Sequence, residues 1–243
     1  MREWWRELGS LMLPTACAGC GVGWGVLCAA CRELLWARPA RRVWPVPEPA
    51  GLPAVYAVAE YADEARAMLL AHKERGMLGL AGPLGRGLAA GVRAAVAGGP
   101  RGSPGGALGG ALGGASGEVI GLVPVPSARA AVARRGHDPV RRLAMAAAGW
   151  LRREGRAVRV ARALRQCRPV ADQAGLTAGQ RVANLAGALT VRSGALTPGE
   201  RVVLVDDVLT TGASLVEAAR AVRSAGGLPL GAAVIAGPPM GWM

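Results

Sequence analysis

The sequence predicts an α/β protein in which helices flank a parallel sheet and a small cysteine-rich module precedes it. Short apolar runs at residues 119–123, 201–205 and 228–235 have the length and composition of buried strands. Helical patterns at 139–153 and 213–224 fall between these runs, and strands that alternate with helices are typical of a parallel sheet. Four of the five cysteines lie within the first 50 residues, which sets that segment apart.

Proline-rich sequence around residue 50 predicts an extended linker after the cysteine-rich segment. We therefore expect a small domain at 1–50 and a larger one at 51–243. The larger domain begins with a predicted strand at 55–60 and a helical stretch at 63–70.

The later elements are bounded by residues that end regular structure. Residues 97–118 are so rich in glycine that they predict a mobile connection rather than a packed element. Pro124 stops the strand predicted at 119–123, and Gly226 with Gly227 closes the helix predicted at 213–224.

Charge and hydropathy also bear on where the chain resides. No apolar run approaches ~18 residues, so no membrane span is predicted. Charges at Glu3, Arg6 and Glu7 interrupt what would have to be the apolar part of a secretory signal. We expect a cytoplasmic protein, whose cysteines are reduced or bound to a metal.

Two CxxC pairs predict a structural zinc site. Pairs of this kind let four thiolates converge on one tetrahedral ion and leave no open coordination position. Disulfides, unbound thiols and an iron centre are the alternatives, and a cytoplasmic setting argues against disulfides. Cys167 has no base or orienting partner nearby in the sequence, so we interpret it as incidental. The predicted ligands are Cys17, Cys20, Cys28 and Cys31.

The stretch VVLVDDVLTTGAS at residues 202–214 predicts a phosphosugar-binding turn. A buried strand delivers Asp206 and Asp207 at its carboxyl end, and a Thr-Gly turn then starts a helix. The free amides of a helix start, together with hydroxyl groups, can surround a phosphate. The two carboxylates can accept hydrogen bonds from the vicinal hydroxyls of a ribose. The predicted phosphate-binding residues are Thr210, Thr211, Gly212, Ala213 and Ser214.

These residues resemble the motif with which type I phosphoribosyltransferases bind phosphoribosyl pyrophosphate (PRPP). The resemblance implies that Asp206 and Asp207 hold the ribose hydroxyls and that residues 210–214 hold the 5-phosphate. It also implies Mg²⁺ bound with PRPP, and a reaction that displaces pyrophosphate from the anomeric carbon. Purine-salvage members carry an acidic base where this chain has Thr210, so the catalytic residues stay unknown.

The order of a four-cysteine module, a linker and this domain resembles the ComF (competence protein F) family. Lys73, Arg75 and Gly76 match its K-x-R-G segment, and residues 122–144 and 164–189 are similar to two further stretches of that family. The resemblance implies a role in DNA uptake during natural transformation, by handling single strands or by docking on a competence helicase. An active phosphoribosyltransferase of nucleotide metabolism is the alternative.

The same resemblance suggests where pyrophosphate would bind. In type I enzymes the turn after the first core strand cups pyrophosphate, and here that turn carries Ser127 and Arg129. Lys73, the only lysine, is a further candidate contact to an anion or otherwise a solvated helix end. Where relatives carry an Arg-Gly-Phe-Asn-Gln run, this chain has His137 and Asp138 after Arg-Gly, so the amides of that run are missing. His72 and His137 are candidate general bases.

The net charge of +13 comes mostly from residues 129–168, which hold twelve arginines and only two acids, Asp138 and Glu154. Such a concentration of charge predicts salt-dependent binding of an anionic partner. A surface for single-stranded nucleic acid, a pocket for PRPP and a solvated basic face all stay open. Trp150 is the only aromatic residue of that stretch, which argues against stacking of bases. We also expect residues near 51–62 and 160–192 to form a hood over the sheet. The oligomeric state is not predicted.

Overall fold

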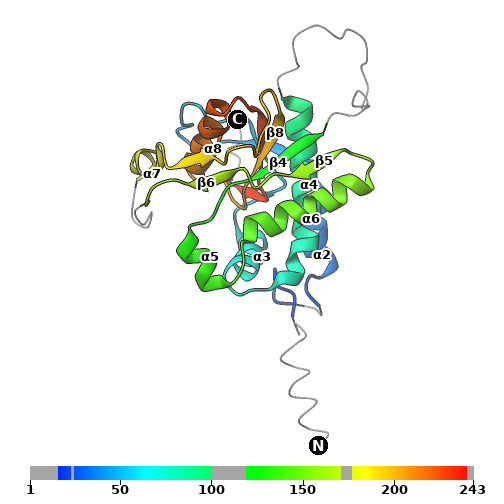
Figure 1. The fold of residues 1–243 in the computed structure, drawn as a ribbon. Helices are drawn as coiled ribbons and strands as arrows, with labels where there is room; N and C mark the ends of the chain where they lie inside the picture. The colour runs from blue at the N-terminus through cyan, green and yellow to red at the C-terminus, as the bar shows by residue number, and fades with distance from the viewer. Residues whose placement is uncertain (1–15, 23–24, 100–118, 171–176, 240–243) are drawn as a thin grey trace, which may run out of the picture.

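The computed structural model describes residues 16–22, 25–99, 119–170 and 177–239 (Figure 1). Most of the predicted glycine-rich connection and the charged N-terminal segment lie outside these residues. The strands are β1 (Arg41–Val43), β2 (Val55–Ala57), β3 (Ala59–Glu60), β4 (Ile120–Pro124), β5 (Val158–Val160), β6 (Leu164–Gln166), β7 (Leu189–Val191), β8 (Arg201–Val205), β9 (Leu228–Ala233) and β10 (Ala236–Gly237). The helices are α2 (Ala29–Trp36), α3 (Asp63–Lys73), α4 (Ala81–Gly98), α5 (Arg129–Arg135), α6 (Pro139–Arg153), α7 (Ala178–Leu185) and α8 (Ala213–Ser224), with a 3₁₀ turn at Leu78–Leu80.

Six strands form the central sheet in the order β1-β2-β9-β8-β4-β5. Every neighbouring pair is parallel except β1 with β2. The predicted strands at 119–123, 201–205 and 228–235 are β4, β8 and β9, so the predicted α/β class is confirmed. Because β1 lies within residues 1–50 and pairs with β2, the segment before the linker also contributes to the sheet; the domain boundary near residue 50 stays a prediction.

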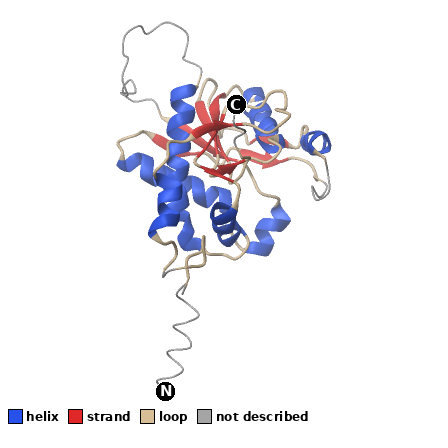
Figure 2. Ribbon diagram, turned by 180° about the vertical axis from the view of Figure 1, so that it is seen from behind, coloured by secondary structure: helices blue, strands red, loops and turns tan. Residues whose placement is uncertain are grey.

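The sheet carries helices on both faces (Figures 1 and 2). Side chains of successive residues in a strand point to opposite faces, and two apolar clusters follow this rule. Leu122 and Val203 pack on the side of α4 and α6, whereas Val123 and Leu204 pack on the side of α8. The buried sheet is therefore rigid where its strands end, which is where a binding site needs fixed residues.

The neighbouring strands β4 and β8 mark the place where the chain changes direction across the sheet. Their backbones pair from Gly121 with Val202 to Pro124 with Val205. From β4 the chain passes through α6 to β5, and from β8 it passes through α8 to β9 on the opposite side. Ligands of open α/β sheets bind in the crevice outside the carboxyl ends of the strands at such a point.

Helix α4, which the sequence patterns did not predict, packs directly on α6. A Cβ atom added to Gly85 would overlap the side chain of Ala146, so the absence of a side chain there lets the two helices approach closely. The four-cysteine segment packs on the same helix. The indole Nε1 of Trp36 donates a hydrogen bond to the carbonyl oxygen of Pro83 at 3.1 Å, and the guanidinium of Arg86 lies 4.2 Å from the centre of the Trp36 ring.

The predicted hood is only partly correct. Within the described part of 160–192, β6 and β7 form a separate two-stranded antiparallel ribbon, and α7 lies between these strands in sequence. The predicted strand at 55–60 instead divides into β2, which belongs to the central sheet, and β3, which pairs with β10. In the described part of the chain, no helix has the length and hydropathy needed to cross a membrane.

Candidate functional site

The turn predicted to bind a phosphosugar lies between β8 and α8. Strand β8 ends at Val205, the acidic pair follows, and α8 begins at Ala213. Gly212, the residue before α8, has a φ of 75°, a conformation that favours glycine. A Cβ at this position would lie 2.9 Å from Cδ1 of Leu52. The backbone angle therefore favours glycine at the start of the helix, and a side chain there would also displace the end of the Leu52 side chain.

The acidic pair is held by short hydrogen bonds. Oδ1 of Asp206 accepts a hydrogen bond from the backbone N–H of Asp207 at 2.8 Å. Asp207 is only 6% exposed, and its Oδ2 accepts a hydrogen bond from Nζ of Lys73 at 2.6 Å. The candidate anion contact at the end of α3 thus lies beside the candidate ribose contact, 134 positions further along the chain.

Burial and charge shift the pKa values of this cluster. Burial raises the pKa of the Asp206 carboxyl well above its usual value, and the charge of Asp207 raises it further. Burial acts to lower the pKa of Lys73, but the Asp207 carboxylate outweighs burial, so this pKa is raised. Both shifts favour the protonated forms, which are the neutral carboxyl of Asp206 and the charged ammonium of Lys73.

A cavity of about 740 Å³ opens at this edge of the sheet, large enough for a small-molecule ligand. Of the predicted site residues, the cavity is lined by Lys73, Ser127, Asp206, Asp207, Thr210 and Ser214. The side chain of Arg129 lies outside the described part of the structure. Thr211, Gly212 and Ala213 complete the turn without lining the cavity.

The cavity also has walls that the sequence patterns did not indicate. Tyr61 follows β3, Glu74 follows α3, Arg134 belongs to α5 and Gln166 ends β6, and all four line the cavity. A forked ion pair ties two of these elements together, because Nε and Nη2 of Arg135 donate to the Glu74 carboxylate at 2.9 and 2.7 Å. No motif links these residues in sequence, since each is brought to the cavity by a different element.

The two histidines lie behind the cavity rather than in its lining. His72 is only 1% exposed and its Nε2 has no hydrogen-bond partner within the described residues. Burial lowers the pKa of His72 to about 4, and the charges of His137 and Arg142 contribute to the decrease. The ring of His137 lies between the carbonyl oxygens of Arg135 and His72, at 3.1 and 3.2 Å from its nitrogens. These contacts favour a packing role for both rings over the predicted role as general base.

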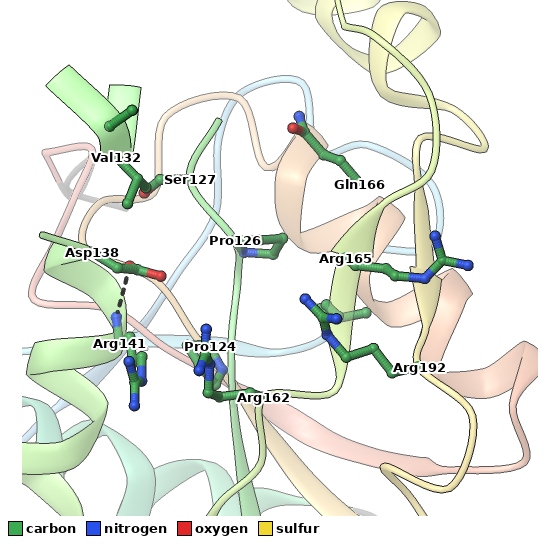
Figure 3. Close-up of a pocket in the computed structure, with 12 residues that line it drawn as sticks. Pro124, Pro126, Ser127, Val132, Asp138, Arg141, Arg162, Arg165, Gln166 and Arg192 are labelled. Atoms are coloured by element: carbon green, nitrogen blue, oxygen red, sulfur yellow. Dashed lines mark hydrogen bonds between the residues drawn. The ribbon is translucent and has the colours of Figure 1, made fainter. Parts of the chain in front are cut away.

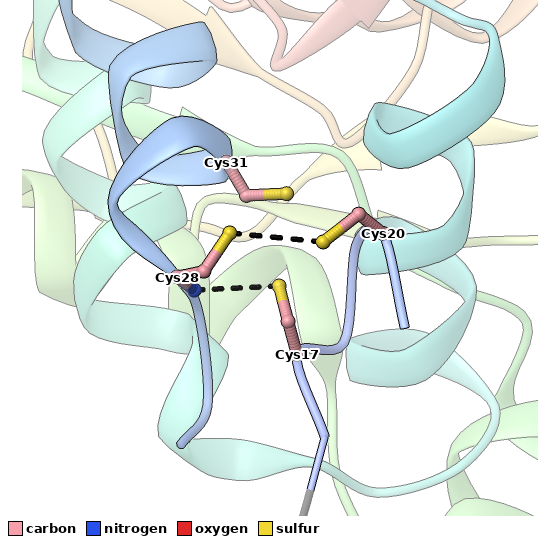
Figure 4. Close-up of side chains that lie close together, drawn as sticks. All are labelled: Cys17, Cys20, Cys28 and Cys31. Carbon is pink, nitrogen blue, oxygen red and sulfur yellow. Dashed lines mark hydrogen bonds between the residues drawn. The ribbon is translucent and has the colours of Figure 1, made fainter. Parts of the chain in front are cut away.

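The four predicted cysteine ligands converge (Figure 4). Their Sγ atoms all lie within 4.8 Å of one another. Zn–S bonds of ~2.3 Å place tetrahedral ligands about 3.8 Å apart, and the 3.7 Å between the sulfurs of Cys20 and Cys28 matches this separation. The donor set and its geometry therefore fit a structural zinc ion.

Cys17 and Cys31 differ in how readily their thiols release the proton that a metal ion replaces. Burial acts to raise the pKa of Cys17, but hydrogen bonds from the backbone N–H groups of Cys28, Cys20 and Gly19 lower it to about 6. Burial raises the pKa of Cys31. Metal ligation requires thiolates, so Cys17 is ready to bind zinc near neutral pH and Cys31 must release its proton.

Besides the four-cysteine cluster, the chain contains a region that is similar to the phosphoribosyltransferase domain. Residues 156–243 match the family model described as "Phosphoribosyl transferase domain"; this range includes β8, the acidic pair and α8.

Two curated proteins with similar sequences are orotate phosphoribosyltransferases. The one from Pelotomaculum thermopropionicum is 50% identical over 50 residues, which cover 20% of this chain and 26% of that protein. The one from Pyrobaculum islandicum is 56% identical over 41 residues, which cover 17% of this chain and 21% of that protein. The chain thus spans about a quarter of the length of these relatives.

Proposed function

We propose that the chain binds PRPP, or a related phosphosugar, together with Mg²⁺ in the cavity at the carboxyl edge of the sheet. The observation that carries this proposal is that the acidic pair, Lys73, Ser127 and the turn residues Thr210 and Ser214 line one cavity. Two hydroxyls and the first amides of α8 provide donors for a phosphate, and two carboxylates provide acceptors for the ribose hydroxyls. Such a set suits a sugar that carries both a phosphate and a free diol.

Each group in the cavity has a role in this proposal. Thr210, Ser214 and the amino end of α8 bind the 5-phosphate, and Asp206 with Asp207 orients the ribose ring. Ser127 and Lys73 contact the pyrophosphate, and the resemblance to type I enzymes adds Arg129 to the proposed contacts. Mg²⁺ prefers oxygen ligands, so the acidic pair is the donor set for it in the described cavity. When bound, the ion would neutralise charge on the pyrophosphate.

The enzymatic alternative is transfer of the phosphoribosyl group to an acceptor. In this reaction a nucleophile forms a bond to the anomeric carbon while the bond from that carbon to pyrophosphate breaks, and pyrophosphate leaves with the bonding electrons. The short similarity to orotate phosphoribosyltransferases supports this alternative.

A screen of acceptors tests whether transfer occurs. We expect pyrophosphate release when the protein is incubated with Mg²⁺, PRPP and one class of nucleobase or amine, orotate among them. The matched control is the Asp206→Asn, Asp207→Asn protein, which should release none. If no acceptor causes release while calorimetry shows that PRPP binds, the enzymatic alternative is wrong and the binding proposal stands.

We further propose, following the resemblance to ComF proteins, that the chain supports DNA uptake by handling single strands or by docking on a competence helicase. The twelve arginines of residues 129–168 support this proposal. Several of them, including Arg141 and Arg142 on α6, are exposed. Sequence-independent binding of strands depends on such charges and weakens with salt.

Fluorescence anisotropy with a single-stranded oligonucleotide tests the DNA proposal. We expect affinity to fall steeply with salt. In a protein with Arg134→Ala, Arg141→Ala and Arg142→Ala, the salt slope should decrease by ~0.7 for each phosphate that the protein no longer neutralises. Arg135 stays unchanged because it donates two hydrogen bonds to the Glu74 carboxylate, whereas Arg134 only approaches that carboxylate at 3.9 Å. Absence of binding at low salt would remove direct DNA binding from the proposal.

A further inference from the structure

A second cavity, of about 360 Å³, lies next to the phosphosugar cavity and is lined by arginines (Figure 3). The two cavities share Pro126, Ser127 and Gln166 as lining residues. The second cavity contains none of the turn residues of 206–214. It therefore adjoins the phosphosugar cavity at the turn after β4 and has a lining of its own beyond that turn. Its arginines are Arg141, Arg162, Arg165 and Arg192.

The charge of this recess, which we call the arginine pocket, is not balanced by the protein. Its lining holds four guanidinium groups and one carboxylate, that of Asp138. Oδ1 of Asp138 accepts a hydrogen bond from the backbone N–H of Arg141 at 3.1 Å, so this carboxylate serves as the N-cap of α6. Within the described residues, no ion pair or side-chain hydrogen bond is found for any of the four guanidinium groups.

Regular structure fixes the backbone positions of these arginines. Arg141 lies in the first turn of α6, and Arg162 precedes β6, which the buried residues Ala163 and Leu164 anchor. The backbone N–H of Arg192 donates to the carbonyl oxygen of Ala163 at 2.8 Å, which holds the end of β7 beside the start of β6. In Figure 3 the side chains of Arg141, Arg162 and Arg192 lie around the segment of Pro124 and Pro126, and Arg165 points outward.

Like charges that converge on a recess repel one another, and an anion removes this cost. Guanidinium groups present forked pairs of donors that match phosphate oxygens. A single phosphate ester presents its three acceptor oxygens at one point, whereas the arginines come from α6, the start of β6 and the end of β7. A diphosphate, with acceptor oxygens on both phosphorus atoms, suits the recess better.

We propose that the arginine pocket is a second anion site that binds a diphosphate group, either inorganic pyrophosphate or the diphosphate of a nucleotide. Of the predicted contacts of PRPP, only Ser127 lines the arginine pocket, because it lies on the wall that the two cavities share. The turn at 206–214, Arg129 and Lys73 are not part of its lining. The lining has no aromatic side chain on which bases could stack, which favours a small ligand over a nucleic-acid strand. The site does not depend on phosphosugar binding.

Isothermal titration calorimetry with Mg²⁺-free pyrophosphate and with ADP tests the proposal. We use the protein with Lys73→Gln, Asp206→Asn and Asp207→Asn as background, so that the phosphosugar cavity loses its lysine contact to an anion as well as its carboxylates, and its own failure stays distinguishable. Adding Arg141→Gln, Arg162→Gln and Arg192→Gln should weaken diphosphate binding at least about tenfold, equivalent to ~1.4 kcal/mol. Arg223→Gln, on the exposed end of α8, is the matched control and should leave the affinity unchanged.

Two further comparisons identify the source of the diphosphate and test whether the forked geometry of the guanidinium groups matters. Tighter binding of ADP than of pyrophosphate identifies a nucleotide, and the reverse identifies the free ion. Lysine at the same three positions keeps the charge but loses the forked geometry, so it should restore only part of the affinity. The proposal is overturned if neither diphosphate binds, if the glutamine protein binds as tightly as its control, or if only a single-stranded oligonucleotide depends on the three arginines.

Discussion

Mg²⁺-dependent binding of PRPP is expected to disappear when Asp206→Asn and Asp207→Asn are combined. Each carboxylate accepts charge-assisted hydrogen bonds in the proposed complex, and such bonds contribute ~1.5–3 kcal/mol. Loss of both should therefore weaken binding about 100-fold or more, since ~1.4 kcal/mol corresponds to tenfold. Calorimetry of PRPP with Mg²⁺ measures this loss directly.

The fold must be checked in parallel, because Asp207 pairs with Lys73. Asparagine keeps the size of the side chain and a hydrogen-bond acceptor for Nζ of Lys73, so the circular dichroism spectrum should match that of the unchanged protein. Glu33→Gln, at an exposed position of α2, is the matched control for loss of one carboxylate. Ser214→Ala provides a milder test of the turn that leaves every charge in place. Unchanged affinity in the double variant would overturn the pocket assignment.

The affinity for PRPP with Mg²⁺ should also depend on pH, because binding changes the protonation of Asp206. Burial and the charge of Asp207 raise the pKa of Asp206 in the ligand-free protein, whereas coordination of Mg²⁺ requires the ionised carboxylate. Binding should therefore release a proton and weaken as the pH falls through the raised pKa. The measured enthalpy should consequently change with the ionisation enthalpy of the buffer, and this dependence should vanish in Asp206→Asn.

Removal of one zinc ligand should have the largest effect on stability. Purified protein should contain about one zinc ion per chain, and Cys17→Ser or Cys28→Ser should remove it. Structural zinc contributes ~10–16 kcal/mol of apparent binding energy in small zinc modules. This contribution is as large as the whole net stability of a typical protein, which is ~5–15 kcal/mol. Cys17 and Cys31 belong to the same apolar cluster as Leu84 and Leu88 of α4, so the loss should extend into the larger domain.

Metal analysis and thermal unfolding check this expectation together. Cys167→Ser is the matched control, because Cys167 lies on the surface after β6 and its Sγ only contacts the carbonyl oxygens of Gly187 and Ala188 at 3.3 and 3.4 Å. The control should keep both its zinc and its unfolding temperature. A protein that is free of metal and still fully folded would contradict the zinc assignment.

The segment from β8 to α8 could be predicted closely from sequence because its signals are local. A run of buried aliphatic residues, an acidic pair, a glycine with positive φ and a helix closed by Gly226 follow one another without interruption. The cysteine ligands were equally predictable, since each CxxC spacing defines its own turn. In both cases the predicted residues lie close to one another in sequence.

Other features depend on contacts that no local pattern reveals. Helix α4 is rich in glycine and alanine, and its packing against α6 makes Gly85 favourable where isolated helices would disfavour glycine. The contact between Lys73 and Asp207 joins residues 134 positions apart. The arginine pocket likewise gathers side chains from α6, the start of β6 and the end of β7. Tertiary packing, rather than propensity, decides each of these features.

The short contact between Lys73 and Asp207 means that the empty site already contains its own counter-ion. A divalent metal that arrives alone must compete with a covalently tethered ammonium group for the same oxygen. A metal that arrives with a pyrophosphate brings anionic oxygens that the displaced ammonium can bind instead. In the proposed complex, cation exchange at Asp207 would couple metal entry to arrival of the sugar ligand, and the protein should hold magnesium weakly until that ligand is present.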